Sequence, residues 1–276
     1  MIQIRTLAHT PVATIVQAFN EAFSDYIVPL QVTEEELQGR AGSGQIQLSH
    51  SVGAFDGERL AGFIFLVTGT MYDRPTLYNG GTGVVPDYRG KQLTNQLYTF
   101  IREHIENGEQ HLLEVITSNV KAVRAYTKVG MHTRRTFNCF KGHSIATPAE
   151  GFVLRKVTSL PVFDTAEFWS VEPSWQNTTA AIACALPEHT IFTIANGRLL
   201  GYVIFATATG RIKQLAVRKD QRRQGIGTAL LAAVSKMLPG KEIIVINADS
   251  SDEGISAFFL ANGLKPFIQQ YEMIMP

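Results

Sequence analysis

The stretch VRKDQRRQGIGTAL, residues 217–230, places three arginines and two glycines ahead of an apolar run. The residues before it alternate as in a strand, and those after it, from Leu230 to Leu238, recur at helical spacing. The start of a helix offers unpaired N–H groups and the positive end of its dipole. Glycines let a ligand approach that backbone closely. The stretch therefore predicts either an anion site, such as one for phosphate, or an ordinary strand-to-helix turn with solvated arginines.

The same pattern occurs twice in the chain. At an offset of 133 residues, VVPDYRGKQLTNQL (84–97) aligns without gaps with VRKDQRRQGIGTAL, and Gly130 falls on Gly263. Upstream, DGERLAGF (56–63) aligns with ANGRLLGY (195–202) at an offset of 139, which predicts six extra residues in a first-copy hairpin around Met71 to Thr76. Two copies of one domain explain this self-similarity more economically than a chance likeness of two amphipathic helices.

Each copy combines helix and strand patterns, which predicts an α/β domain. Helices are expected to start at Thr10 and Pro11 and at Thr33, where Glu36 completes a capping-box pattern. A last strand of the first copy is expected near residues 136–140. The segment TPAEG, residues 147–151, has the composition of a linker, so the expected domains are 1–147 and 151–276.

Composition excludes several classes of protein. The chain has 276 residues, 45% of them apolar and 18% charged, with a net charge of +1, and it has no basic run that could follow a nucleic-acid backbone. It shows neither a signal-peptide pattern nor an apolar run long enough to cross a membrane, so we expect it in the cytoplasm. Two cysteines and seven scattered histidines have no metal-ligand spacing, so we expect no metal.

The repeated motif resembles that of the GCN5-related N-acetyltransferase (GNAT) superfamily. The matching features are Arg-x-x-Gly-x-Gly between strand and helix, then a strand, an Asn and A-x-x-x-Y-x-x-x-G ending at Gly130. The resemblance is strong in 82–131 and 212–264. It implies two tandem GNAT-like domains, each a mixed, mostly antiparallel sheet flanked by helices. It also implies that the loop binds the pyrophosphate of coenzyme A and that an amine attacks the acetyl thioester directly.

The resemblance assigns cofactor contacts to both copies. In the first copy they are Val84, Val85, Arg89, Gly90, Lys91, Gln92, Leu93, Thr94 and Asn119. In the second copy the candidate loop is Arg222, Arg223, Gln224, Gly225, Ile226 and Gly227. The first copy departs from the pattern, because Gln92 and Thr94 replace its two glycines. Its loop nevertheless resembles the RGKQL-type loops of glucosamine-phosphate acetyltransferases in the same family.

Two residues of the first copy are candidates for catalysis. Tyr126 lies seven residues after Asn119, so both share one helix face, and the family's tyrosine protonates the departing thiolate. The alternative is an aromatic residue of the core. Glu114 resembles the general base of ribosomal-protein alanine acetyltransferases, or it is a sheet carboxylate that orients a neighbour. The second copy has Asn247, Asp252 and Phe259 at the positions of Glu114, Asn119 and Tyr126.

These observations predict an acetyl-CoA-dependent N-acetyltransferase whose first domain transfers acetyl to an amine of a small molecule or peptide. Asp25 and Tyr26 are the candidate acceptor residues. One alternative is an arrangement like that of mycothiol synthase, with the C-terminal domain active. Another is a non-catalytic acyl-CoA-binding module. No nucleic acid or membrane is expected as a partner, and the sequence predicts no oligomeric state.

Overall fold

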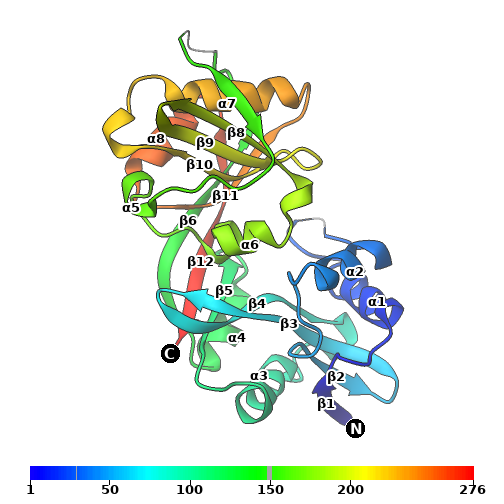
Figure 1. Ribbon diagram of the computed structural model, residues 1–276. Helices are drawn as coiled ribbons and strands as arrows, with labels where there is room; N and C mark the ends of the chain where they lie inside the picture. Colours follow the sequence, from blue (N-terminus) through cyan, green and yellow to red (C-terminus); the bar gives the residue numbers. More distant parts are fainter. Residues whose placement is uncertain (29, 148–150) are drawn as a thin grey trace. The chain divides into compact units, whose positions relative to one another are not determined.

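The computed structural model describes residues 1–28, 30–147 and 151–276. The chain forms two compact units (Figure 1). The first unit comprises Met1–Arg134 and Tyr271–Pro276, and the second unit comprises Arg135–Gln270. Each unit combines a sheet with helices, so the predicted α/β class with two similar domains is confirmed.

The units divide the chain differently from the expected domains 1–147 and 151–276. Strand β6 (His132–Gly142) pairs through residues 137–142 with β11 (Ile243–Asp249), so most of β6 belongs to the second unit. The end of β12 (Lys265–Met275) belongs to the first unit, where Met273 is buried in the core. Pairings between segments this far apart in sequence are not specified by a local repeat. Within the expected linker, residues 148–150 lie outside the described residues.

The first unit is built on the strand order β1-β2-β3-β4-β5, followed by the end of β12. From β1 to β5, only the β4–β5 pair is parallel. The elements are β1 (Ile2–Thr6), α1 (Val12–Ala22), α2 (Glu34–Gly42), β2 (Val52–Asp56), β3 (Arg59–Met71), β4 (Arg74–Val84), the 3₁₀ turn Pro86–Tyr88, α3 (Leu93–His104), β5 (Gln110–Ile116) and α4 (Val120–Lys128).

Helices cover both faces of this sheet. Alternate residues of β3 belong to two separate core clusters. Phe63 and Phe65 pack in the cluster that contains the buried side chains of α1. Ile64 and Leu66 pack in the cluster that contains those of α3. In α1 the buried residues recur at helical spacing, and Phe19 lies within 6.1 Å of the Phe65 ring centroid. The predicted capping box of α2 is confirmed, because Thr33 and Glu36 exchange side chain-to-backbone hydrogen bonds of 3.2 and 2.9 Å.

The second unit repeats this plan in the strand order β6-β11-β10-β9-β8-β7. No helix among the described residues is long and apolar enough to cross a membrane. The elements are β7 (Leu154–Val157), α5 (Thr165–Phe168), the 3₁₀ turn Trp175–Asn177, α6 (Thr179–Ala183), the 3₁₀ turn Leu186–Glu188, β8 (His189–Asn196), β9 (Arg198–Ala206), β10 (Arg211–Val217), the 3₁₀ turn Lys219–Gln221, α7 (Ile226–Met237) and α8 (Glu253–Ala261), in addition to β11 and part of β6 and β12.

A bulge and a parting of strands occur at the same place in both units. In β4, Asn79 faces Leu66 and Gly81 faces Phe65, which leaves Gly80 as the extra residue of a bulge. In β10 the register shift leaves Lys213, the residue that the repeat aligns with Gly80. Among the described residues, the parallel pairing of β4 with β5 ends at Asn79 and Leu113, although both strands continue. The pairing of β10 with β11 likewise ends at Ile212 and Val245.

The longer first-copy hairpin lies where the two offsets predict it. Strand β3 ends at Met71 and β4 begins at Arg74, so the turn is Tyr72 and Asp73, both with positive φ as in a type I′ turn. The Tyr72 hydroxyl donates to the buried carboxylate of Glu272, and the Arg134 guanidinium lies 3.7 Å from the centroid of the Tyr72 ring. The extension therefore contacts the part of β12 that belongs to the first unit.

The loops before α3 and α7 share one backbone conformation but exchange their glycines. Positive φ values occur at Gly90 (78°) and Gln92 (57°) in the first unit, and at Arg223 (62°) and Gly225 (86°) in the second. The repeat aligns these positions pairwise. Each loop therefore places glycine at only one of two left-handed positions, and an L-residue at the other costs about 1–2 kcal/mol. The two loops thus adopt the same backbone conformation although each has glycine at only one of these two positions.

We expect Arg223→Gly to stabilise the protein by about 0.5–1 kcal/mol, because the relief of left-handed strain exceeds the extra entropy that glycine loses on folding. Gly225→Ala is the matched opposite change and should destabilise it by about 1 kcal/mol. Urea unfolding of the full chain measures both. A loss of stability in Arg223→Gly would contradict this account of the loop.

Candidate active site

The start of α3 has the chemistry of a phosphate cradle. No side chain caps this helix among the described residues, so the first-turn N–H groups stay available. A Cβ added at Gly90 would meet no atom within 4 Å, which shows that the backbone is open there. Lys91 is exposed, and Lys128 donates to the Gln92 side chain at 2.9 Å. The uncapped helix start, the open backbone and the nearby ammonium groups suit a pyrophosphate.

The Arg89 side chain ties the end of α1 to the end of β4. Its guanidinium donates to both carboxylate oxygens of Asp25, at 2.6 and 2.7 Å, and to the carbonyl oxygens of Ala22 and Val84, at 3.0 and 3.2 Å. The hydrogen bonds from Arg89 hold the pKa of Asp25 below its usual range. The expected cofactor residue Arg89 and the expected acceptor residue Asp25 thus contact each other.

Arg222 makes the same connection in the second unit. It donates to the carbonyl oxygen of Val217 at 3.3 Å, to that of Phe168 at 2.7 Å and to the Ser170 hydroxyl at 2.9 Å. Val217 is the repeat equivalent of Val84. The arginine at this place in the motif therefore anchors the segment before β2 in the first unit and the segment before β8 in the second.

Two other expected cofactor residues lie in the core of the first unit. The Val85 side chain is fully buried, and its N–H donates to the carbonyl oxygen of Ala61 at 2.9 Å. The Leu93 side chain is 2% exposed and packs in the cluster beneath α3. Their side chains support the loop from below, whereas Val84 and Thr94 are only partly buried.

Asn119, Tyr126 and Tyr26 are brought together. Asn119 caps α4 by accepting from the Ala122 N–H at 3.2 Å, and its side chain neighbours the Tyr26 phenol, where it opposes the rise that burial causes in the pKa of Tyr26. Tyr126, two turns further along α4, is 8% exposed. Burial raises the pKa of Tyr126 to about 12, the neighbouring Thr82 hydroxyl opposes that rise, and nearby Tyr26 adds to it. Tyr126 is therefore protonated at neutral pH.

Glu114 lies where β5 parts from β4. It follows Leu113, the last residue of β5 paired with β4, and its carboxylate accepts a hydrogen bond from the Tyr78 hydroxyl of β4. The side chain is partly buried. The carboxylate is thus held at the mouth of the parting strands, on the strand next to the bulge at Gly80.

A polar network beside Tyr126 was not expected from the sequence. The Asn79 side chain donates to the Thr82 hydroxyl and to the Tyr98 hydroxyl, both at 2.8 Å. Asn79 is 6% exposed and Tyr98 is 1% exposed. The available signal was an asparagine within the apolar strand pattern that precedes the loop, because a buried polar side chain requires partners.

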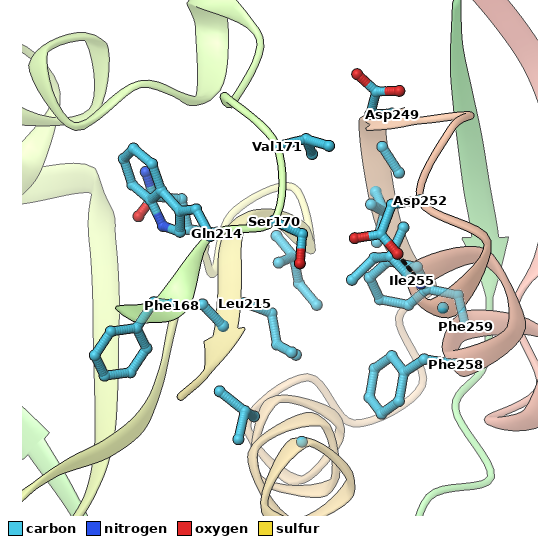
Figure 2. Close-up of a pocket in the computed structure, with 18 of the residues that line it drawn as sticks. Phe168, Ser170, Val171, Gln214, Leu215, Asp249, Asp252, Ile255, Phe258 and Phe259 are labelled. Carbon is cyan, nitrogen blue, oxygen red and sulfur yellow. Dashed lines mark hydrogen bonds between the residues drawn. The ribbon is translucent and has the colours of Figure 1, made fainter. Parts of the chain in front are cut away.

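The second unit contains a cavity of about 690 Å³ where β10 and β11 part, and Figure 2 shows the side chains around it. The loop residues Arg222 and Arg223 and residues 225–228 form part of its lining. Asp252 caps α8 by accepting from the Ile255 N–H at 3.1 Å, as Asn119 caps α4. At the position of Tyr126 the cavity has Phe259, which has no proton to donate.

A neighbouring ring limits the size of the side chain at position 227. A Cβ added there would lie 3.2 Å from an edge atom of Phe258, another residue that lines the cavity. The repeat aligns Gly227 with Thr94 and Phe258 with Ala125. The first copy thus has the larger residue on the loop and the smaller one on the following helix, and the second copy has the reverse.

Comparison with known proteins agrees with this geometry. The model of the acetyltransferase (GNAT) family matches residues 14–131 and 154–263, more than half of the chain. The chain therefore belongs to the acetyltransferase (GNAT) family, whose members transfer acetyl groups from acetyl-CoA. No curated protein matches the chain.

Solved structures of similar fold cover both units. A GCN5-related N-acetyltransferase from Sphaerobacter thermophilus has 18% identity and a TM-score of 0.64, covering 99% of this chain and 95% of that one. A putative acetyltransferase from Pyrococcus horikoshii has 12% identity and a TM-score of 0.71, covering 99% and 89%. A tandem GNAT protein from the clavulanic acid biosynthesis pathway has 14% identity and a TM-score of 0.67, covering 100% and 98%. Identities this low show a shared tandem fold, whereas the reaction must be argued from the site.

Proposed function

We propose that this protein is an acetyl-CoA-dependent N-acetyltransferase that transfers acetyl directly to an amine of a small molecule or peptide, with the chemistry in the first unit. The observation that supports this most is the placement of Glu114 and Tyr126. Glu114 lies where β4 and β5 part, and Tyr126 lies on the helix that follows β5. The second unit has the same backbone plan but Asn247 and Phe259 at these positions.

Coenzyme A would be held mainly by main-chain groups of the first unit. The N–H groups from Gly90 to Thr94 suit its pyrophosphate, and the edge of β4 beyond the bulge suits its pantetheine arm. Asn119, which neighbours Tyr26, is the side chain placed for a further contact. The bound cofactor supplies a thioester carbonyl for attack and a thiolate as leaving group.

The first unit provides a proton acceptor and a proton donor for this reaction. An amine is mostly protonated at neutral pH, so it must lose a proton before it attacks, and the Glu114 carboxylate is placed to take it directly or through water. Tyr126 has its pKa raised to about 12, so it keeps its proton at neutral pH and can donate it to the leaving sulfur. Direct transfer needs no covalent acetyl-enzyme.

Of the two expected acceptor residues, Tyr26 fits that role better than Asp25. Asp25 is already paired with both terminal guanidinium nitrogens of Arg89, which leaves its charge compensated. Tyr26 contacts Asn119 and lies near Tyr126, beside the groups that carry out the chemistry. We therefore place Tyr26 in the wall of the acceptor site and treat Asp25 as the anchor of the segment that presents it.

A second candidate is an active second unit, as in the mycothiol-synthase-like arrangement. The observation that favours it is the cavity of about 690 Å³ beside the glycine loop. Its weakness is the lining, in which Phe259 and Asn247 stand where the first unit has an acid and a base. Release of thiol from acetyl-CoA in the presence of an amine would exclude the third reading, a purely binding module.

The proton donor is tested by Tyr126→Phe, with Phe259→Tyr as the matched change in the second unit. Removal of the Tyr126 hydroxyl should lower kcat by about 10²–10⁴-fold and leave KM for acetyl-CoA almost unchanged, because the ring and its packing stay in place. Phe259→Tyr should not alter the rate. Thiol release with one active amine is the measurement. A Tyr126→Phe enzyme within about twofold of wild type would remove the assignment.

The base is tested by the pH profile of kcat/KM for the amine. Glu114→Gln should lower the rate and flatten the acidic limb, because an amide cannot be switched off by protonation. Glu103→Gln, which changes a carboxylate on α3 that is 63% exposed, is the control and should keep the wild-type profile. An unchanged acidic limb in a folded Glu114→Gln enzyme would assign the titration to another group.

The position of the working cofactor site is tested by two equivalent exposed loop residues. Lys91→Glu places a negative charge at the start of α3 and should weaken acetyl-CoA binding about tenfold or more, with parallel loss of kcat/KM. Gln224→Glu places the same charge before α7, at the repeat position of Lys91, and should leave turnover unchanged. Calorimetry and thiol release on the full chain measure both. The opposite pattern would move the site to the second unit.

A further inference from the structure

The Asn79 amide of β4 has a fixed orientation. Its Oδ1 accepts from the Gly81 N–H at 2.9 Å, so its Nδ2 must point the other way, toward the hydroxyls of Thr82 and Tyr98. An amide nitrogen has two protons and only donates. Both hydroxyl oxygens therefore act as acceptors toward Asn79, and each keeps its own proton for another partner.

The Thr82 hydroxyl neighbours the phenol of Tyr126. This neighbour opposes the rise that burial causes in the pKa of Tyr126, as expected for a donor that favours the phenolate over the phenol. The ring of Tyr98 packs edge-on against that of Tyr126, with centroids 6.3 Å apart, and keeps the ring in place. Tyr126 is thus the last member of a polar chain that includes Asn79, Thr82 and Tyr98.

The second unit lacks every member of this chain. The repeat aligns Asn79, Thr82, Tyr98 and Tyr126 with Ile212, Leu215, Leu231 and Phe259. Ile212, Leu231 and Phe259 are at most 3% exposed and belong to the apolar core, and β10 still has its bulge at the equivalent residue. The same backbone fold therefore forms with apolar side chains at these four positions. Because buried polar groups cost free energy unless they are paired, their presence in the first unit calls for a reason other than folding.

We infer that Thr82, held by Asn79, is a positioning residue for proton donation by Tyr126. When the phenol O–H bond breaks and an S–H bond forms on the leaving thiolate, the negative charge moves from sulfur to the phenolate oxygen. The Thr82 hydroxyl donates to that oxygen and keeps its own proton throughout. The proton taken from the amine by Glu114 balances the one that Tyr126 gives, and exchange with water restores both groups. This inference rests on the proposed function.

The test compares Thr82→Val, which removes the hydroxyl at nearly constant shape, with Thr82→Ser, which retains it. We expect Thr82→Val to lower kcat about ten- to hundredfold with KM for acetyl-CoA unchanged, because hydrogen bonds to charged groups are the strong ones. Thr82→Ser should stay within about threefold of wild type. Thr99→Val, on the exposed side of α3, is the control for loss of a threonine hydroxyl.

A double-mutant cycle with Tyr126→Phe decides whether Thr82 acts through the phenol. Without a phenol the Thr82 hydroxyl has no phenolate to stabilise, so the double variant should be no slower than Tyr126→Phe alone. Equal rates for Thr82→Val and wild type, or a double variant slowed by the product of the two single effects, would overturn the inference. If Tyr126→Phe itself keeps the wild-type rate, the proposed proton donor fails first, which separates the two failures. Thermal unfolding of each variant identifies any loss that is due to folding.

Discussion

The parting of β4 from β5 is the constraint on which the candidate site depends. Parallel strands that stayed paired to their ends would satisfy each other's backbone groups and leave no room for a ligand. Here the bulge at Gly80 directly follows the last paired residue, Asn79, so the free edge of β4 leads straight to the loop and to α3. Glu114 directly follows the last paired residue of β5, and Tyr126 lies on α4, the helix that follows this strand.

The two units show how one backbone plan supports different chemistry. Both have the bulge, the parted strands, the anchoring arginine and a loop with two left-handed residues. Their side chains differ most around the position of Tyr126, where the first unit is polar and the second is apolar. The second unit therefore acts as an internal reference: features that both units share belong to the common backbone plan, and the polar side chains present only in the first unit point to the proposed chemistry.

The sequence predicted the features that depend on local pattern. The repeat, the longer first hairpin, the capping box at Thr33 and the α/β class all follow from spacing and composition, and all are confirmed. The pairing of Arg89 with Asp25 and the network around Asn79 depend on contacts between residues distant in sequence, so spacing alone could not predict them. For the same reason, the sequence did not predict that the end of β12 belongs to the first unit. The roles of Glu114 and Tyr126 stay predictions.

The assignment of β12 has a consequence for biosynthesis. Met273 is fully buried in the core of the first unit, yet it leaves the ribosome only after the whole of the second unit has been made. At about 5–20 residues per second, residues 1–134 wait on the order of ten seconds for the strand that completes their core. During that delay the nascent first unit lacks the buried Met273, so its maturation depends on the synthesis of residues 271–276, and a chain that stops before them is expected to bind chaperones.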